Sequence, residues 1–360
     1  MLIPWSGFRN RRLMRSKRSN DQQPEQQANR CFGYKKEFGM NKVAKNIIAA
    51  LKTMSLPVIL MVVMKLVFPE NIGMRTLQNM IYQSVPAAIL AWGVSFNMKI
   101  GNWDFSVGAA AMISAIVGGN IASMLGLGPV GMLVLCTGVG LLCGCITGTL
   151  YYLLKIPTLI ISLGMVYLME SLSAIIFNGA GVFITGEYVA LTEALPMLGF
   201  GAAALAFSIF LFYARPFGYH VRAVGNGAAI AAQEGIDIYK VKFRVLVIAS
   251  TFAGLYAFAT LARTGVWKAS SSPMSTMGTC FDAMMCVFIG QALGAATNQF
   301  IGIYFGSVTL QMVKLLIILL GIKSTFTQVI ISMIVLVFMC ISTRADHNNK
   351  LQLQKGRVTA

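Results

Sequence analysis

Residues 129–154 read PVGMLVLCTGVGLLCGCITGTLYYLL and contain no charged side chain. A helix that crosses the hydrocarbon core of a bilayer needs roughly 20 consecutive, mainly apolar residues, and this run exceeds that length. Glycine recurs along it, which favours close helix packing in lipid, because small residues let two backbones approach. The run therefore predicts a membrane-spanning helix that packs closely on a neighbour.

The composition extends this prediction to most of the chain. Of its 360 residues, 56% are hydrophobic and only 11% are charged, and the mean hydropathy is +0.70. Soluble domains carry about a quarter charged residues, so we predict an all-α, polytopic transmembrane helical bundle of about ten spans, with broken or re-entrant helices. The apolar segments lie at about 47–68, 79–98, 104–124, 129–154, 157–178, 198–214, 243–262, 280–296, 301–321 and 325–342.

Basic residues predict the orientation of these spans. Eleven Lys and Arg precede Ile47, five lie in the loop 215–244, and four follow Thr343. Cytoplasmic flanks of membrane spans are enriched in Lys and Arg, and an even number of spans places both termini on one side. We therefore expect a cell (inner) membrane protein with both termini and the loop 215–244 in the cytoplasm. Residues 179–197, which contain no Lys or Arg, are expected outside.

Three parts of the chain follow from this pattern. Residues 1–46 form a basic, Gln-rich head without hydrophobic periodicity, which we expect to be disordered and cytoplasmic. Residues 47–342 form the membrane domain, and residues 343–360 form a cytoplasmic tail. The natural start is Met1 or Met40, since Met40 opens the sequence MNKVAKN.

Several classes of function are excluded by what the sequence lacks. The net charge of +17 gathers at the ends of spans and comes with no basic-aromatic motif, so nucleic acid is not an expected partner. The chain has two histidines, and its seven cysteines form no C-x-x-C pair, which leaves little material for a metal site or a catalytic triad. No phosphate-binding G-x-x-x-x-G-K-[ST] loop occurs. We expect no catalytic residue, metal or cofactor in this chain, so any ATP would be used by a partner.

Three carboxylates, Asp104, Glu170 and Asp282, fall within or at the edge of spans. A charge at the bilayer centre costs about 3 kcal/mol on insertion scales, so such residues usually face a cavity or a partner. Asp104 lies in the polar interruption GNWDFSVG. This pattern indicates either a discontinuous helix that lines the protein interior or an N-terminal helix cap at Asp104, and the two are compatible.

The other two carboxylates receive different predictions. Glu170 is expected to have a structural role, pairing with a Ser or Tyr inside the bundle. Asp282 follows SSSPMSTMGTCF, a Ser/Thr-rich stretch broken by proline that predicts a re-entrant segment, and its role is left open between structure and function. Lys314, one turn after Gln311, is expected to point into the bundle or to extend to the membrane surface.

A short polar segment, AVGNGAAIAAQEGIDIYKVK at residues 223–242, separates two apolar spans. Asn226 is expected to cap a short helix over Gly227 to Glu234, and Gly235 suits the left-handed turn that ends it. Ile236 is an apolar knob beyond that turn, and basic residues follow it. The segment is either a surface helix that a cytoplasmic partner grips or a solvated connector.

This segment resembles the cytoplasmic coupling loop of the ribose/xylose/galactoside-type permeases of ATP-binding cassette importers. The positions that fit the pattern are Gly225, Ala229, Gly235, Ile236 and Lys242. Upstream, residues 104–108 read DFSVG, which is similar to the family's D-L-S-V-G. The run GCITGTLYYLLKIPTLIISLG also resembles a family stretch, and the likeness covers about residues 77 to 342 in order. The D-[LF]-S-V-G signature favours a sugar over a branched-chain amino acid or nucleoside.

The resemblance implies how such a chain works and with what. It implies about ten helices per subunit, a second permease copy or paralogue, a cytoplasmic ATPase pair and an extracytoplasmic sugar-binding protein. The implied substrate-pathway residues are Asp104, Phe105, Ser106, Glu170 and Asp282. The implied ATPase-coupling residues are Gly225, Asn226, Ala229, Glu234, Gly235 and Ile236. A family Gly-rich loop is replaced here by GQALGAATNQFIG at residues 290–302.

A competing hypothesis is an ion-coupled secondary transporter that uses intramembrane carboxylates as a relay. It predicts transport without an ATPase and dependence on a proton or sodium gradient.

Overall fold

The computed structural model describes residues 54–70, 72–191, 193–270, 272–294 and 298–322, and the single positions 326, 329, 330 and 333. The chain divides into two compact units, residues 1–51 and 52–360, and every described residue belongs to the second. The predicted head, 1–46, and tail, 343–360, lie outside the described residues.

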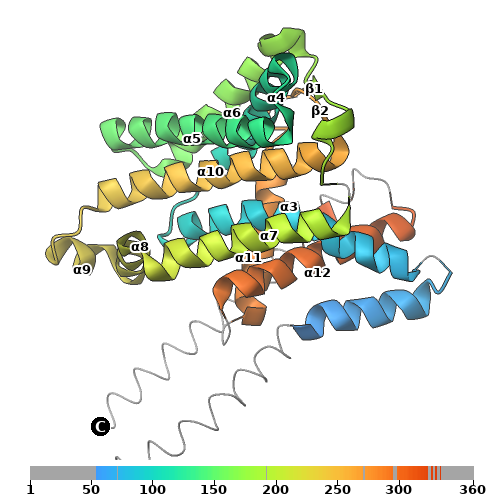
Figure 1. Ribbon diagram of the computed structural model, residues 1–360. Helices are drawn as coiled ribbons and strands as arrows, with labels where there is room; N and C mark the ends of the chain where they lie inside the picture. The colour runs from blue at the N-terminus through green and yellow to red at the C-terminus, as the bar shows by residue number, and fades with distance from the viewer. Residues whose placement is uncertain are drawn as a thin grey trace, which may run out of the picture. The chain divides into compact units, whose positions relative to one another are not determined.

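Helices make up nearly all of the described part of this second unit (Figure 1). A short apolar helix, Met54–Val67, comes first. The longer helices are α3 (Met74–Lys99), α4 (Ser106–Leu125), α5 (Gly128–Leu154), α6 (Thr158–Ile175), α7 (Ala194–Ile209), α10 (Ile238–Thr264), α11 (Met277–Gly294) and α12 (Gln299–Leu319). The short elements are η1 (Ile176–Gly179), η2 (Gly186–Tyr188), the π-helical turn η3 (Phe210–Ala214), α8 (Pro216–Asn226), α9 (Ala228–Gln233), β1 (Val182–Phe183) and β2 (Val266–Trp267).

The Gly-rich run of α5 packs on α10. Gly140, Gly144 and Gly148 recur every four residues and therefore lie on one face of the helix. A Cβ atom at Gly140 would lie 2.5 Å from the carbonyl oxygen of Ser250, and one at Gly144 would lie 2.8 Å from the Cβ of Ser250. Only glycine permits this approach of the two backbones, so the close packing predicted for this run is present.

An aromatic cluster joins the second half of α3 to its neighbours. The Phe96 ring centroid lies 5.6–6.2 Å from four other ring centroids, those of Phe212, Phe217, Phe252 and Phe300. Trp92, which is fully buried, donates a hydrogen bond from Nε1 to the carbonyl oxygen of Phe300 at 2.9 Å. These contacts connect α3 with η3, α8, α10 and the start of α12.

The chain breaks between α3 and α4, as the polar interruption predicts. Gly101 holds a φ of +72°, a left-handed conformation that lets the backbone turn. Asn102 and Asp104 are buried, whereas Trp103 between them is 39% exposed. The segment thus presents alternate side chains to the protein interior.

The two ends of α10 carry different structures. Its first residue, Ile238, follows α8 and α9, and its last residue, Thr264, precedes β2 (Figure 1). There β2 pairs antiparallel with β1, with Val182 opposite Trp267. Helices α8 and α9 therefore lie at one end of α10, and the β1–β2 ribbon lies at the other.

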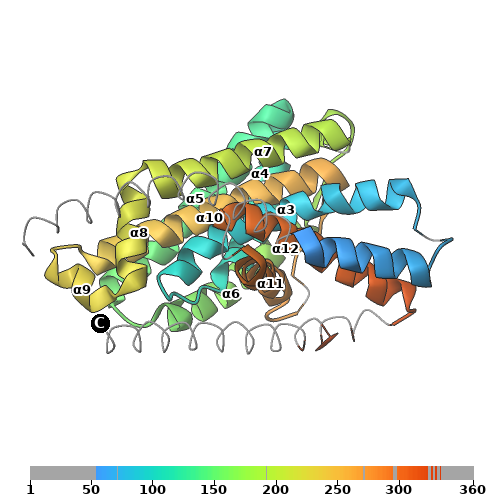
Figure 2. The same cartoon turned by 90° about the horizontal axis from the view of Figure 1, so that it is seen from below.

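Helix α11 runs across the direction of its neighbours. Figure 2 shows α11 nearly end-on, whereas α3, α7 and α10 are seen along their lengths. It packs on α3, α4 and α12. The stretch SSSPMSTMGTCF before Asp282, for which the sequence predicts a re-entrant segment, corresponds to the connection that precedes this transverse helix and to its first residues.

The fold class predicted from the sequence is confirmed, and the chain is a multi-pass helical membrane protein. Among the described residues, 6 helices are long and apolar enough to cross a membrane, and two shorter apolar helices accompany them. Helix α3 has 26 residues and is largely buried in the bundle. The last predicted span, 325–342, lies mostly outside the described residues, so the total of ten stays a prediction.

Candidate functional site

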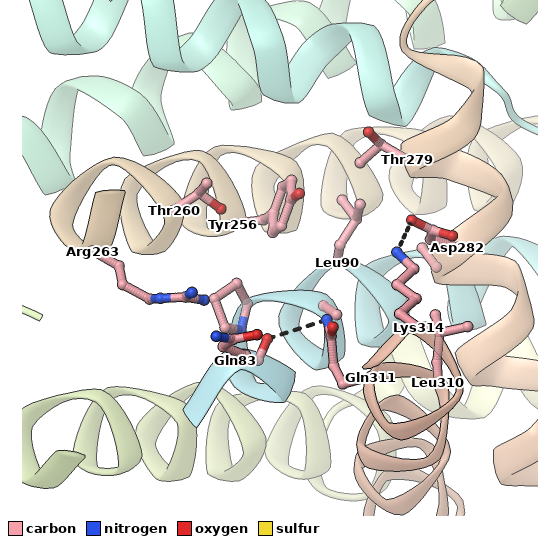
Figure 3. A pocket seen from close by; sticks show the side chains of 13 residues that line it. Gln83, Leu90, Tyr256, Thr260, Arg263, Thr279, Asp282, Leu310, Gln311 and Lys314 are labelled. Carbon is pink, nitrogen blue, oxygen red and sulfur yellow. Dashed lines mark hydrogen bonds and ion pairs between the residues drawn. The ribbon is translucent and has the colours of Figure 1, made fainter. Parts of the chain in front are cut away.

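A cavity of about 140 Å³ lies between α3, α10, α11 and α12 (Figure 3). Its lining residues are Gln83, Pro86, Ala87, Leu90, Tyr256, Thr260, Arg263, Thr279, Asp282, Ala283, Leu310, Gln311 and Lys314. Polar side chains from four helices thus converge inside an otherwise apolar bundle, as in a site for a hydrophilic solute.

An ion pair closes one end of this cavity. Lys314 of α12 donates from Nζ to Oδ2 of Asp282 on α11 at 2.5 Å, and the two side chains are 28% and 24% exposed. Pairing reduces the cost of holding two charges away from water. Of the two placements expected for Lys314, the structure has the inward one. Asp282 is the predicted pathway carboxylate that lies in the cavity wall.

A guanidinium occupies the other end. Arg263 lies in the last turn of α10, and Figure 3 shows its side chain extending toward Gln83 of α3, at the opposite end of the cavity from the Asp282–Lys314 pair. Tyr256 and Thr260 lie between the two ends along α10. Gln311 of α12 donates from Nε2 to the Gln83 carbonyl oxygen at 3.4 Å. The cavity is therefore charged at both ends and uncharged in its middle.

Sequence reasoning missed most of this lining. It singled out Asp282 and Lys314 but not Gln83, Gln311 or the polar face of α10. The signal was present, because Tyr256, Thr260 and Arg263 follow one another at spacings of four and three and so share one helix face. A search for polar residues at helical spacing, in place of a search for carboxylates, would have found them.

Asp104 lies in the break between α3 and α4, away from the cavity, and its carboxylate accepts a hydrogen bond from the first amide of α4 although it does not occupy the N-cap position. Its carboxylate accepts hydrogen bonds from the Ser106 amide (3.0 Å), from Ser106 Oγ (2.6 Å) and from Asn97 Nδ2 (3.2 Å). It thus satisfies the first turn of α4 and ties it to the last turns of α3 across the break. The N-cap position itself is Phe105, whose ring packs on Phe281 with centroids 5.5 Å apart.

Glu170 has the structural role predicted for it. It is buried, and Oε1 accepts from the Thr276 amide at 2.8 Å and from Thr276 Oγ1 at 2.7 Å. Its other oxygen accepts from the Met274 amide at 2.6 Å, and Ser275 Oγ lies 3.4 Å from Oε1. A carboxylate at the start of a helix is stabilised by exposed amides and by the helix dipole. Glu170 therefore anchors the start of α11 to α6.

The three intramembrane carboxylates all meet α11, yet at separate points. Glu170 binds the residues that precede it, the carbonyl oxygen of Asp104 accepts from Cys280 Sγ at 3.4 Å, and Asp282 lies on the helix itself. The structure thus brings one of the three into the cavity. The other two contact the transverse helix or the residues before it, as does the Phe105 ring, whereas Ser106 bonds to Asp104.

Helix α8 was not predicted, and it changes the interpretation of Asn226. The predicted cap at Asn226 is wrong, because Asn226 is the last residue of α8 and Gly227, extended at φ 170°, precedes α9. Pro216 at the first turn of α8 favours this helix. Its packing explains Gly225, where a Cβ atom would lie 2.3 Å from the Lys99 carbonyl oxygen at the end of α3.

Helix α9 is a short, exposed surface element. Ala229, Glu234 and Gly235 are exposed, Ile236 is half-buried, and Ile230 projects with 63% of its surface exposed. The left-handed turn predicted at Gly235 is present, with φ +83°.

Charged groups fix the transition from this turn into α10. Asp237 accepts from the Lys240 amide at 3.1 Å, and its other oxygen lies 3.3 Å from Lys240 Nζ. The Lys240 amide, followed by the Lys240 side chain, lowers the pKa of the Asp237 carboxyl. The carboxylate therefore stays ionised at neutral pH and caps α10.

Comparisons with known proteins agree with this architecture. The family described as the branched-chain amino acid transport system / permease component matches residues 76–340. The fructose import permease protein of Rhizobium meliloti is 24% identical over 254 residues, 66% of this chain and 69% of that protein. The ribose import permease protein of Escherichia coli K12 is 22% identical over 302 residues, 79% of this chain and 91% of that protein.

A fructose import permease protein of Bifidobacterium longum matches over a longer region. It is 22% identical over 334 residues, 87% of this chain and 95% of that protein. No solved structure matches the chain significantly. These findings confirm the family resemblance seen in the sequence.

Proposed function

The chain belongs to this family of transport-system permease components, and we propose that it forms the translocation pathway for a monosaccharide in an ATP-binding cassette importer. The proposed substrate is ribose, fructose or a related small polyol, because the relatives reported above are named as ribose and fructose import permeases. The observation that carries the proposal is the polar cavity between α3, α10, α11 and α12.

The chemistry of this cavity suits a sugar. Hydroxyl groups both donate and accept hydrogen bonds, and the lining offers an accepting carboxylate at Asp282, donors at Lys314 and Arg263, and amides at Gln83 and Gln311 that do both. A volume of about 140 Å³ suits one small solute and not an oligosaccharide. Such a lining would be costly inside a membrane bundle without a hydrophilic occupant.

The proposed drive comes from a separate cytoplasmic ATPase, with no cofactor in this chain. Helix α9 presents exposed Ile230 and Ala229 beside α8, which a 2.8 Å hydrogen bond from Arg222 to the Phe212 carbonyl oxygen ties to η3. An exposed apolar tip on a fixed base can enter a cleft and transmit its movement to α10. Gly225, Asn226, Glu234, Gly235 and Ile236 shape or flank this tip.

The remaining partners follow from the orientation that the charge pattern predicts. With α8 and α9 in the cytoplasm, the end of α10 that carries Arg263 and β2 faces outward, where an extracytoplasmic sugar-binding protein would deliver the solute. Both termini would then be cytoplasmic. A second permease copy or a paralogue would complete the pathway in the bilayer.

The ion-coupled alternative is not favoured. A carboxylate relay needs acidic groups along one route, whereas Asp104 and Glu170 each accept several hydrogen bonds that hold helices together. Neither lines the cavity.

Uptake by cells that lack this gene tests the proposal. We expect deletion to abolish uptake of labelled ribose or fructose and the intact gene to restore it. Restored uptake should stop when ATP is depleted and should survive a protonophore while ATP is maintained. Uptake that follows the proton gradient, or no change in the uptake of either sugar, would contradict the proposal.

A further inference from the structure

The charges in the cavity do not balance. Asp282 and Lys314 neutralise each other through their ion pair, and Arg263 adds a further positive charge. In the part of the chain that the structure describes, the ion pairs are Lys240–Asp237 and Lys314–Asp282, so Arg263 has no carboxylate partner there. The cavity lining therefore carries one excess positive charge.

An unpaired guanidinium in a partly buried site favours an anionic ligand. Arg263 is half-buried, and a charge withdrawn from water is costly until an opposite charge meets it. The planar guanidinium presents donors in a fork that matches a carboxylate, and such charge-assisted pairs are about twice as strong as neutral hydrogen bonds.

The positions of the groups say where the anion would lie. Figure 3 shows Arg263 and Gln83 at one end of the cavity and the Asp282–Lys314 pair with Thr279 at the other. A ligand with a carboxylate at one end and hydroxyls at the other would pair with the guanidinium and leave its hydroxyls to the ion pair.

From this arrangement we propose that the cavity, which takes neutral monosaccharides such as ribose or fructose, binds a sugar acid, a monosaccharide that bears a carboxylate, more tightly than the corresponding neutral sugar, and that Arg263 is the residue that determines this preference. The inference rests on the proposed function, because it names the class of sugar that the same cavity takes.

Binding to the purified full-length chain in lipid nanodiscs tests the inference. D-glucuronate and D-glucose are matched probes, since they share a ring and differ in a carboxylate against a hydroxymethyl group. We expect D-glucuronate to bind at least about tenfold more tightly, the lower end of what a hydrogen bond to a charged group provides. Arg263→Gln should remove that advantage and leave D-glucose binding within about threefold of the original chain.

Arg244→Gln is the control, because Arg244 is an exposed arginine at the opposite end of the same helix. It should keep the preference for D-glucuronate. Equal binding of the two probes, or a preference that survives Arg263→Gln, would overturn the inference while leaving sugar transport intact; Arg263 would then serve only the C-terminal dipole of α10. Binding of neither probe, with no uptake of ribose or fructose, would overturn the proposed function as well.

Discussion

Replacing Gly235 by valine tests how much the turn after α9 contributes to the proposed contact with the ATPase. Gly235 holds a φ of +83°, and no atom lies within 4 Å of the place where its Cβ would be. The substitution therefore introduces no clash, and its cost is backbone strain of roughly 1–2 kcal/mol. Strain of that size shifts a local equilibrium by about 5- to 30-fold. The turn that ends α9 should then be populated far less.

The strain should act on the end of α9. The turn is held by hydrogen bonds from the Gly235 amide to Ala232 (3.1 Å) and from the Ile236 amide to Ala231 (3.0 Å). Losing them frays a helix of only 6 residues. We expect Gly235→Val to reduce the amount of ATPase recovered with the permease by about 5- to 30-fold, the factor that corresponds to this strain. Alternatively, the ATP hydrolysis that the loaded binding protein stimulates should fall by the same factor.

Two controls separate strain from position. Gly235→Asn should keep the contact, because asparagine tolerates the left-handed region. Gly186→Val imposes similar strain, since Gly186 has φ +70° and nothing within 4 Å, but it lies near the β1–β2 end. It should leave the ATPase contact unchanged. Normal recovery and normal stimulation with Gly235→Val would refute the reasoning, and residues 223–242 would be a connector only.

Three further predictions concern the carboxylates and the source of energy. Glu170→Gln should lower the melting temperature, because the amide has one accepting oxygen where the carboxylate has two, and its NH2 group leaves a buried backbone donor unpaired at a cost of roughly 1–3 kcal/mol; an unchanged thermal unfolding curve would contradict its role as the anchor of α11. Asp104→Ala should reduce sugar uptake more than assembly, because it unties α3 from α4; an assembled variant that transports at the original rate would show Asp104 to be dispensable. The purified chain alone should hydrolyse no ATP, since it has no phosphate-binding loop, and turnover in a preparation free of other subunits would disprove the assignment.

Long apolar runs made the fold class predictable. A run such as residues 129–154 exceeds what a bilayer requires and has no polar face, so helix and membrane follow from composition. The break at Asp104 was also predictable, because three polar residues between two glycines cannot continue a lipid-facing helix. The left-handed turn at Gly235 was predictable because glycine adopts that conformation without strain.

These rules do not predict the transverse course of α11 or the cavity. Helix α11 is apolar like its neighbours, and its direction is set by contacts far away in the sequence, such as the bonds to Glu170 from the residues just before its start. The cavity collects side chains from four helices, and its members are not close in sequence. Helix α8 was missed because its amphipathic pattern, with Val221 and Val224 buried, is short and lies between basic residues.

The most direct test of the central claim, that a sugar passes through the cavity, is uptake by a variant in which the cavity is filled. Thr279 lines the cavity from α11 and is half-buried, so Thr279→Phe would place a ring in a space of about 140 Å³ without replacing a charged group. Assembly should be checked by recovery of the ATPase with the variant. We predict an assembled complex whose uptake of the labelled sugar falls at least about tenfold. An assembled variant with unchanged uptake would show that the solute takes another route through the protein.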